Sequence, residues 1–358
     1  MTTLVQDRMP QASAPLVGQG AGLIRAWLVL LALMVYAMIL IGGATRLTDS
    51  GLSITEWEPI SGALPPLSGA DWQDEFDKYR QTTEYRDVNR GMSMAQFQFI
   101  YWWEWGHRQM GRLIGLVAVV GFAFFAARGW LSRRLTLRLG MIIALGGLQG
   151  FIGWWMVSSG VGETQRVDVA PYRLMTHFTL ALLIIALIFW TWLDLSGRKP
   201  GSGASRFSGL AILLLALTAV QMAAGALVAG LDAGRSYTDW PLMLGEFLPG
   251  DYWLPEYGAR NAFENRATVQ FNHRILAYAL WALAFYAAWR ARGTDMARGF
   301  AILAGLVTLQ ALWGIWTLIS AAPLPLALVH QGLGVIVTLA AVWLVWLSSA
   351  DRTGSACQ

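Results

Sequence analysis

Long apolar runs alternate with short polar segments along most of this chain. A helix needs about 20 mainly apolar residues to cross a bilayer. Segments of this length, with few or no charges over most of their course, occur at residues 26–45, 104–127, 139–158, 172–193, 208–230, 272–290, 299–320 and 325–348. The pattern predicts an all-α integral membrane protein with eight transmembrane helices.

The composition supports a chain that lies mostly in a lipid bilayer. Apolar residues make up 56% of it and charged residues only 13%, and the mean hydropathy is +0.46. A soluble protein carries about 25% charged residues. The single cysteine, Cys357, has no partner for a disulfide within the chain, and a cysteine-ligated cluster is excluded. There is no basic tract, so the net charge of +4 is interpreted as membrane topology, and no nucleic-acid partner is expected.

Basic residues are concentrated on one side of the predicted membrane. With the N-terminus on the cytoplasmic side, the inner segments hold 13 of the 26 basic residues but only four of the 22 acidic ones. This asymmetry follows the positive-inside rule and predicts that both termini are cytoplasmic. The first 24 residues are polar and small and precede Arg25, so no cleaved signal peptide is expected.

Two outer loops, about 46–100 and about 231–270, are long and contain Trp, Tyr and Pro. Structureless loops of this length are uncommon, so both are expected to be ordered caps with short helices. A segment rich in Gly and Ser marks the midpoint of the chain. The predicted organisation is a cytoplasmic N-terminal tail (1–25), a four-helix bundle (26–195), a linker (196–206), a second four-helix bundle (207–348) and a C-terminal tail (349–358).

The two predicted bundles share sequence patterns in the same order. The pattern D-x-G-x-S-x-T-[ED]-W begins at Asp49 and again at Asp232. Further along, Leu-Gln followed by Gly and Trp occurs at 148–155 and again at 309–316. Ordered matches of this kind indicate an internal duplication. Because each half has an even number of spans, the two halves have the same orientation in the membrane. This predicts two tandem pseudo-symmetric four-helix bundles.

Four histidines are the candidate functional residues of this chain. They lie near the outer ends of the even-numbered spans, and they are His107, His177, His273 and His330. A titratable residue inside a membrane is costly and usually functional. One histidine on each of two facing helices can bind haem iron from both sides, whereas zinc normally requires four ligands, or three and water. For a single histidine, the alternative is a hydrogen-bonded residue near the headgroups.

A carboxylate distinguishes the first histidine pair from the second. Glu104 precedes His107 by about one helical turn and lies on the same helix face, and Gln270 takes this place before His273. Glu104 is interpreted as an acid, a base or a cation stabiliser beside a haem. The alternative is an ion pair with a nearby arginine.

An arginine directly follows one histidine in each half. Arg108 and Arg274 could bind haem propionates through bidentate hydrogen bonds. The alternative is that each is an interfacial arginine whose charged group reaches the membrane surface.

These features together resemble the haem A synthase family over residues 25–348. The resemblance rests on the four-histidine repeat, the run Gly-Gly-Ala-Thr-Arg-Leu-Thr-Asp-Ser-Gly-Leu-Ser at 42–53, and Glu-x-x-His-Arg at 104–108. It implies an oxidoreductase of the bacterial inner membrane that converts haem O to haem A for terminal oxidases. The C8 methyl group of haem O would be oxidised to a formyl group by successive hydroxylations.

The resemblance also implies roles for the two histidine pairs. A haem b cofactor would bind to His273 and His330, and the substrate haem would bind to His107 and His177. Glu104 would be important for turnover. Haem O synthase would supply the substrate, and an electron donor such as a ferredoxin would be needed.

Some bacterial members of this family have a cysteine pair in the first outer loop, but residues 46–100 contain no cysteine. The chain therefore resembles the group that includes mitochondrial and alphaproteobacterial forms. A non-enzymatic di-haem b-type electron-transfer cytochrome and a haem carrier are the alternative functions. The sequence leaves open the oxygen source, whether the protein is a homo-oligomer, and whether His107 and His177 both stay on the substrate iron.

Overall fold

The computed structural model describes residues 20–58, 61–162, 164–196 and 204–349, and every helix or strand assigned within them is a helix. Each predicted apolar segment falls on one long helix. These are α1 (Ala21–Leu47), α4 (Met94–Ala127), α5 (Arg133–Val157), α6 (Pro171–Asp194), α7 (Ser208–Gly230), α9 (Arg266–Arg290), α10 (Ala297–Ile319) and α11 (Leu324–Ser349). The all-helical fold class is confirmed for the described part of the chain.

Seven helical segments of the described chain are long and apolar enough to cross a membrane. They are α1, α4, α5, α6, the segment Ala204–Gly230 that contains α7, α10 and α11. Helix α9 is not among them, because Gln270, Asn272, His273 and Arg274 make its outer part polar. The chain is a multi-pass membrane protein, and an eighth span stays a prediction.

Two helices begin well before the apolar runs that predicted them. At the start of α4, Ser93 and Gln96 form a reciprocal capping box, in which each side chain accepts from the other residue's backbone N–H. At the start of α9, the Asn265 side chain accepts a hydrogen bond from the backbone N–H of Ala267. These caps set where α4 and α9 begin, outside the segments that carry His107 and His273.

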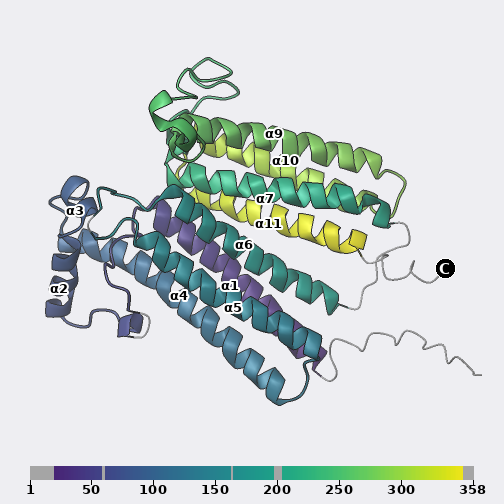
Figure 1. Cartoon of the computed structure of the whole chain (residues 1–358), viewed down its shortest axis with the longest axis horizontal. Helices are drawn as coiled ribbons and strands as arrows, with labels where there is room; N and C mark the ends of the chain where they lie inside the picture. Colours follow the sequence, from purple (N-terminus) through teal and green to yellow (C-terminus); the bar gives the residue numbers. More distant parts are fainter. Residues whose placement is uncertain (1–19, 59–60, 163, 197–203, 350–358) are drawn as a thin grey trace, which may run out of the picture.

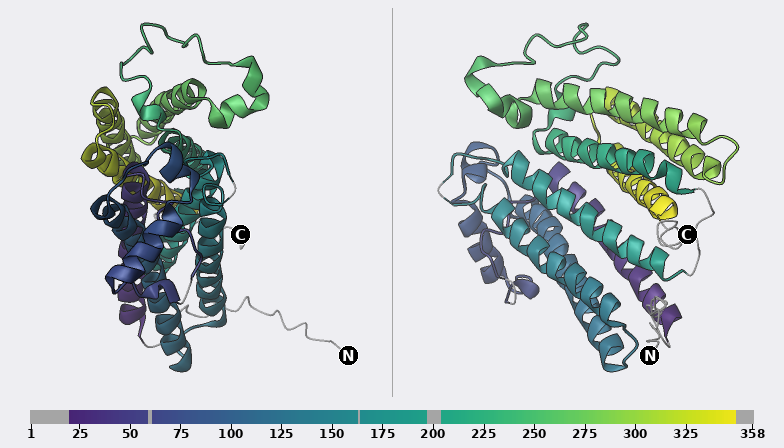
Figure 2. Two further views of the ribbon diagram at one scale, coloured as in Figure 1. Left: turned by 90° about the vertical axis from the view of Figure 1, so that its left-hand side faces the viewer. Right: turned by 45° about the vertical axis from the view of Figure 1, so that its right-hand side comes forward.

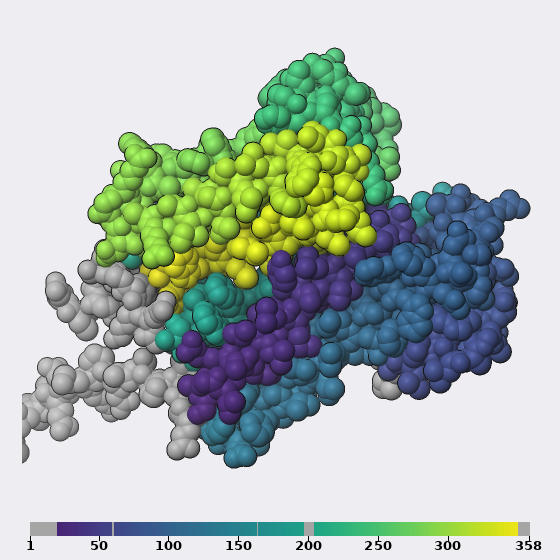
Figure 3. Space-filling view, turned by 180° about the vertical axis from the view of Figure 1, so that it is seen from behind, coloured from purple at the N-terminus to yellow at the C-terminus, as the bar shows by residue number. Residues whose placement is uncertain are grey.

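The long helices pack in two groups (Figure 1). We call α1, α4, α5 and α6 the N-terminal half, and α7, α9, α10 and α11 the C-terminal half. The halves meet where α6 packs on α7 and where α11 packs on α1 and α6. Val335 of α11 is fully buried in the apolar core of the N-terminal half. Seen from behind, α1 lies between α11 and α4 (Figure 3).

Both long outer loops contain short helices, as the sequence predicts. The first has η1 (Ser61–Ala63), α2 (Gly69–Tyr79) and α3 (Thr83–Asp87), and the second has η3 (Ala233–Arg235), η4 (Pro255–Arg260) and α8 (Asn261–Glu264). The loops lie at the same end of the molecule (Figure 2). Much of the predicted linker and of both predicted tails falls outside the described residues. The described end of the linker is part of η2 (Ala204–Phe207).

Candidate functional site

Each of the four histidine rings lies against a glycine of a neighbouring helix. A methyl group added at that glycine would lie within 2.6 to 3.1 Å of the ring carbon Cε1, which is closer than such atoms pack. The pairs are Gly42 with His107, Gly153 with His177, Gly225 with His273, and Gly314 with His330. The duplication that the sequence predicts relates the first pair to the third and the second to the fourth. The four glycines therefore leave room for the rings in matching places in the two halves.

Three of the four histidines are also held by a glutamine from the same neighbouring helix. In each case the amide Nε2 donates to the backbone carbonyl of the histidine, at 2.9 to 3.1 Å. The pairs are Gln149 with His177, Gln221 with His273, and Gln310 with His330. The amide oxygen of each glutamine is buried without a hydrogen-bond partner. It is therefore free to accept a hydrogen bond from a ligand at the site.

His107 lacks this arrangement. The residue that the repeat aligns with Gln221 is Met38, and its Cε lies 3.4 Å from the position that a Cβ of Gly111 would take. Within the described residues, Nδ1 of His107 has no hydrogen-bond partner. Sequence reasoning missed Gln221 and Met38, although the spacing of the repeat contains the signal.

The geometry of the C-terminal pair fits a single iron between two imidazoles. The ring centres of His273 and His330 are 6.5 Å apart, and the ring planes are inclined at 81°. A metal-bound imidazole nitrogen lies about 2 Å from the metal, so ring centres on opposite sides of one iron are roughly 6 to 7 Å apart. Nδ1 of His330 is buried and unpartnered.

Glu104 is almost fully buried, with 3% of its surface exposed, and its carboxylate is fully engaged. Oε2 accepts from the Ser53 hydroxyl and from the Ile54 backbone N–H, both at 2.8 Å. Oε1 accepts from Arg108 at 2.6 Å, so the ion pair considered from the sequence is present. Glu104 thus ties the first outer loop to α4, one turn from His107.

The two candidate arginines hold loop carbonyls in matching ways. Arg108 donates to the carbonyls of Ile54 and Glu56, both at 2.9 Å. Arg274 donates to the carbonyls of Tyr237, at 3.1 Å, and Leu242, at 3.0 Å. Propionate binding by either arginine stays a prediction.

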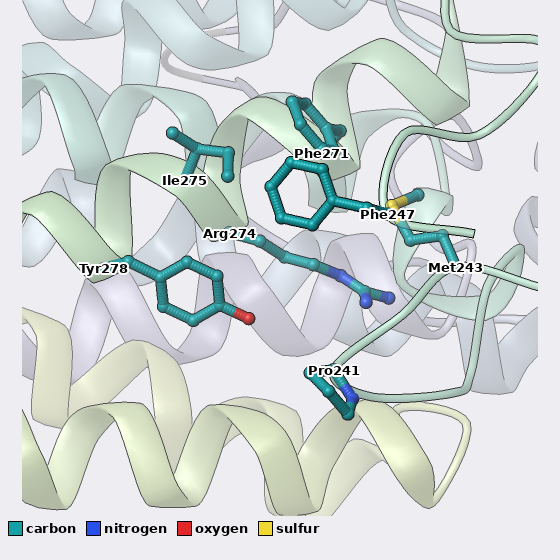
Figure 4. A pocket seen from close by; sticks show the side chains of 7 residues that line it. All are labelled: Pro241, Met243, Phe247, Phe271, Arg274, Ile275 and Tyr278. Atoms are coloured by element: carbon teal, nitrogen blue, oxygen red, sulfur yellow. The ribbon is translucent and has the colours of Figure 1, made fainter. Parts of the chain in front are cut away.

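The second outer loop lies over Arg274. In Figure 4, Arg274 extends from α9 toward the loop segment that carries Pro241 and Met243. Gln270 also donates to the Tyr237 carbonyl, at 2.9 Å. In the C-terminal half a neutral amide therefore stands where the N-terminal half has the Glu104 carboxylate.

Arg46 is a further residue that sequence reasoning missed. Its guanidinium group pairs with Asp49 at 2.7 Å, with Asp232 at 2.8 Å and with Asp168 at 3.7 Å. Asp49 and Asp232 begin the repeated pattern in the two halves, and both have a φ of 50°. Arg46 therefore joins the starts of both outer loops. The signal in the sequence was the aspartate that begins the repeated pattern in each half, since two such carboxylates can share one cation.

Comparison with known proteins gives consistent relationships over nearly the whole chain. The COX15-CtaA family model, described as cytochrome oxidase assembly protein, matches residues 25–342. A Heme A synthase of Hyphomonas neptunium is 65% identical over 345 residues, covering 96% of this chain and 97% of that protein. Heme A synthases of Dinoroseobacter shibae and of Rhodopseudomonas palustris strain BisB5 are 50% and 47% identical. They cover 89% and 93% of this chain, and 85% and 93% of their own lengths. The chain belongs to the haem A synthase family.

Proposed function

We propose that this protein converts haem O to haem A, which serves terminal oxidase assembly. The C8 methyl group of the substrate becomes a hydroxymethyl group, and a second hydroxylation gives a hydrate that loses water to form the formyl group. The observation that carries the proposal is the placement of two histidine pairs in matching positions of two repeated helix groups. Membership of a family whose relatives are named Heme A synthase supports it and does not favour a purely electron-carrying cytochrome.

The two halves take different roles in this proposal. His273 and His330 of the C-terminal half hold a haem b, for which the 6.5 Å ring separation is suited. When bound, haem b supplies one-electron transfer. His107 and His177 of the N-terminal half hold the substrate iron. The half with the buried carboxylate thus becomes the reaction site.

Glu104 and the two arginines act at the outer ends of these sites. Glu104 holds the Ser53–Ile54 segment against α4 and places a negative charge one turn from His107. The proposal gives Glu104 a catalytic role there. Arg108 and Arg274 directly follow His107 and His273 in the chain, and they contribute to binding the propionates of the substrate haem and of haem b.

The membrane setting follows the same reasoning. Helix α9 crosses the bilayer as an eighth span, because it packs against both α7 and α10, which are long and apolar enough to span. The termini are cytoplasmic, and the membrane is the bacterial inner membrane. Haem O synthase supplies the substrate, and a donor such as a ferredoxin supplies electrons.

Haem extraction and chromatography test the proposal. Membranes that contain this protein together with haem O synthase should accumulate haem A and the hydroxymethyl intermediate. The variant His107→Leu should abolish both products while the haem b spectrum remains, and His273→Leu should remove haem b. Haem O accumulating alone with the wild-type protein would refute the enzymatic function. Loss of haem b from His107→Leu instead would refute the assignment of the halves.

A further inference from the structure

A cavity opens on one face of α5 in the N-terminal half. It has a volume of about 470 Å³ and is lined by Gly147, Gly150, Phe151 and Trp154 of α5 and by Trp57 of the first outer loop. The glycines at 147 and 150 have no atom within 4 Å of the place where a Cβ would lie. The two glycines therefore leave part of the cavity lining without side chains, and the remaining lining is apolar. All five lining residues are exposed at the surface of the N-terminal half.

Residues that line the cavity lie next to residues of the histidine site in the N-terminal half. Gly150 and Trp154 flank Gly153, the residue against which the His177 ring lies. On the other side, the Trp57 ring lies 5.9 Å from the guanidinium group of Arg108, which directly follows His107. A group bound between the two histidines could therefore extend into this space.

The corresponding region of the C-terminal half is filled. There, Nε1 of Trp281 on α9 donates to the hydroxyl of Thr308 on α10, at 3.1 Å, and joins the two helices. Measured from the aligned histidines and glutamines, Trp281 corresponds to Gly115 and Thr308 to Gly147. Like Gly147, Gly115 has no atom within 4 Å of a Cβ position. A bulky hydrogen-bonded pair in one half is thus replaced by two glycines in the other.

We infer that the α5 cavity holds the isoprenoid tail of the substrate haem. The Trp281–Thr308 pair prevents a haem with such a tail from binding at the C-terminal site. This inference rests on the proposed function. Haem O differs from haem b chiefly by a long apolar tail on the porphyrin, so a space that is open at Gly147 and occupied by Trp281 and Thr308 in the other half would separate substrate from cofactor. In the bilayer such a tail is already out of water, so packing against Trp57, Phe151 and Trp154 stabilises it through van der Waals contacts that replace contacts with lipid.

The inference is tested by placing the residues of the Trp281–Thr308 pair at the matching glycines of the N-terminal half. The double variant Gly115→Trp with Gly147→Thr should bind haem O at least about tenfold more weakly, because added bulk has no space without displacing the tail. Binding of tail-less haem b to the same half should be unchanged. The measurement is the amount of each haem bound per chain, after purified protein with its haem b in place is mixed with haem O or with extra haem b.

A matched control places the same residue types elsewhere on the same helices. Leu116→Trp with Gly140→Thr introduces the same two residue types, at an exposed site on α4 and at an uncrowded glycine of α5 outside the cavity. It should bind haem O as the wild type does. The haem b spectrum of each variant reports that the C-terminal half is folded.

The reverse variant makes the test independent of any folding defect in the N-terminal half. Trp281→Gly with Thr308→Gly should admit haem O to the C-terminal site, so that purified protein carries haem O in place of part of its haem b. Unchanged haem O binding in the first variant, or exclusion of haem O from the second, overturns the inference. Bound phospholipid in the cavity with no change in haem binding assigns the space to a lipid chain and also overturns it. If the wild type binds no haem O at all, the proposed function itself fails.

Discussion

His107 and His273 occupy matching positions in the two halves, but their surroundings differ. Each ring lies against a glycine, and each helix carries an arginine that holds a loop carbonyl. Around His107, however, Met38 replaces the glutamine and Glu104 replaces the amide of Gln270. The shared residues set where a ring can lie, and the differing residues set how firmly it is held and what charge lies beside it.

The difference teaches how a duplicated framework can carry two roles. A cofactor site benefits from ligands that are held firmly, and Gln221 and Gln310 hold both histidines of the C-terminal pair. A substrate site must release its product. In the N-terminal pair only His177 is held, by Gln149. The less restrained histidine and the open cavity therefore occur in the same half.

The largest expected effect comes from exchanging Glu104 and Gln270, which give the two halves a different charge beside the histidine. Glu104→Gln removes the charge that pairs with Arg108, and breaking a buried pair of this kind costs about 3–5 kcal/mol. Conversion of haem O should fall at least about a hundredfold, because a group that transfers a proton or stabilises charge in a reaction typically contributes a factor of about 100 or more. The haem b spectrum should be unchanged, because the C-terminal half has no contact with this carboxylate in the described structure.

Two further variants make the charge exchange informative. Gln270→Glu, the opposite change in the C-terminal half, should not create a second reaction site and should leave conversion in place. Glu104→Asp keeps the charge and should restore part of the activity. Loss of haem b from Glu104→Gln would show that the halves have been assigned in the wrong order.

A smaller effect is expected from exchanging the residues beside the histidines. Gln221→Met should speed the loss of haem b to a haem acceptor by about tenfold, because groups that orient a metal ligand contribute about that much to affinity. Met38→Gln should slow the release of haem from the N-terminal half by a similar factor. Dissociation rates followed by absorbance measure both effects without requiring turnover.

Gln109→Met provides the control for that exchange. The Gln109 amide donates to the Ala63 carbonyl of the first outer loop, at 3.0 Å, and not to a histidine. It should leave both dissociation rates unchanged. Equal rates in Gln221→Met and the wild type would show that the glutamine holds the helix without affecting the haem.

Sequence reasoning could single out the histidines and Glu104 as candidates because such residues are rare in apolar segments. It also located the long helices, although α4 and α9 begin earlier than predicted, because their caps lie in polar sequence outside the apolar runs. It did not identify Met38, Gly115 or Arg46. A methionine or a glycine is ordinary in a membrane helix, and its meaning emerges only when the opposite half shows what stands in its place.

The smallest expected effect concerns the first outer loop, where the N-terminal half has a buried carboxyl group. Glu84 of α3 is 4% exposed, and its Oε2 has no hydrogen-bond partner. Burial is the main cause that raises the pKa of Glu84 to about 8. A hydrogen bond from Tyr79 opposes the shift, and the nearby Glu104, Asp168 and Asp49 add to it. Glu84 is thus mostly protonated at neutral pH.

This raised pKa makes stability fall as pH rises. Between its ordinary pKa of 4.5 and about 8, the folded protein holds a proton on Glu84 that the unfolded chain has released. The free energy of unfolding therefore decreases with pH over this window and levels off above it. Between pH 6 and pH 9, the melting temperature of the wild type in detergent should fall by about 5 °C more than that of Glu84→Gln. Asp74→Asn, an exposed change on α2, should behave as the wild type does. If Glu84→Gln keeps the full pH dependence, the carboxyl is ionised in the folded loop, and another group must supply the pH response.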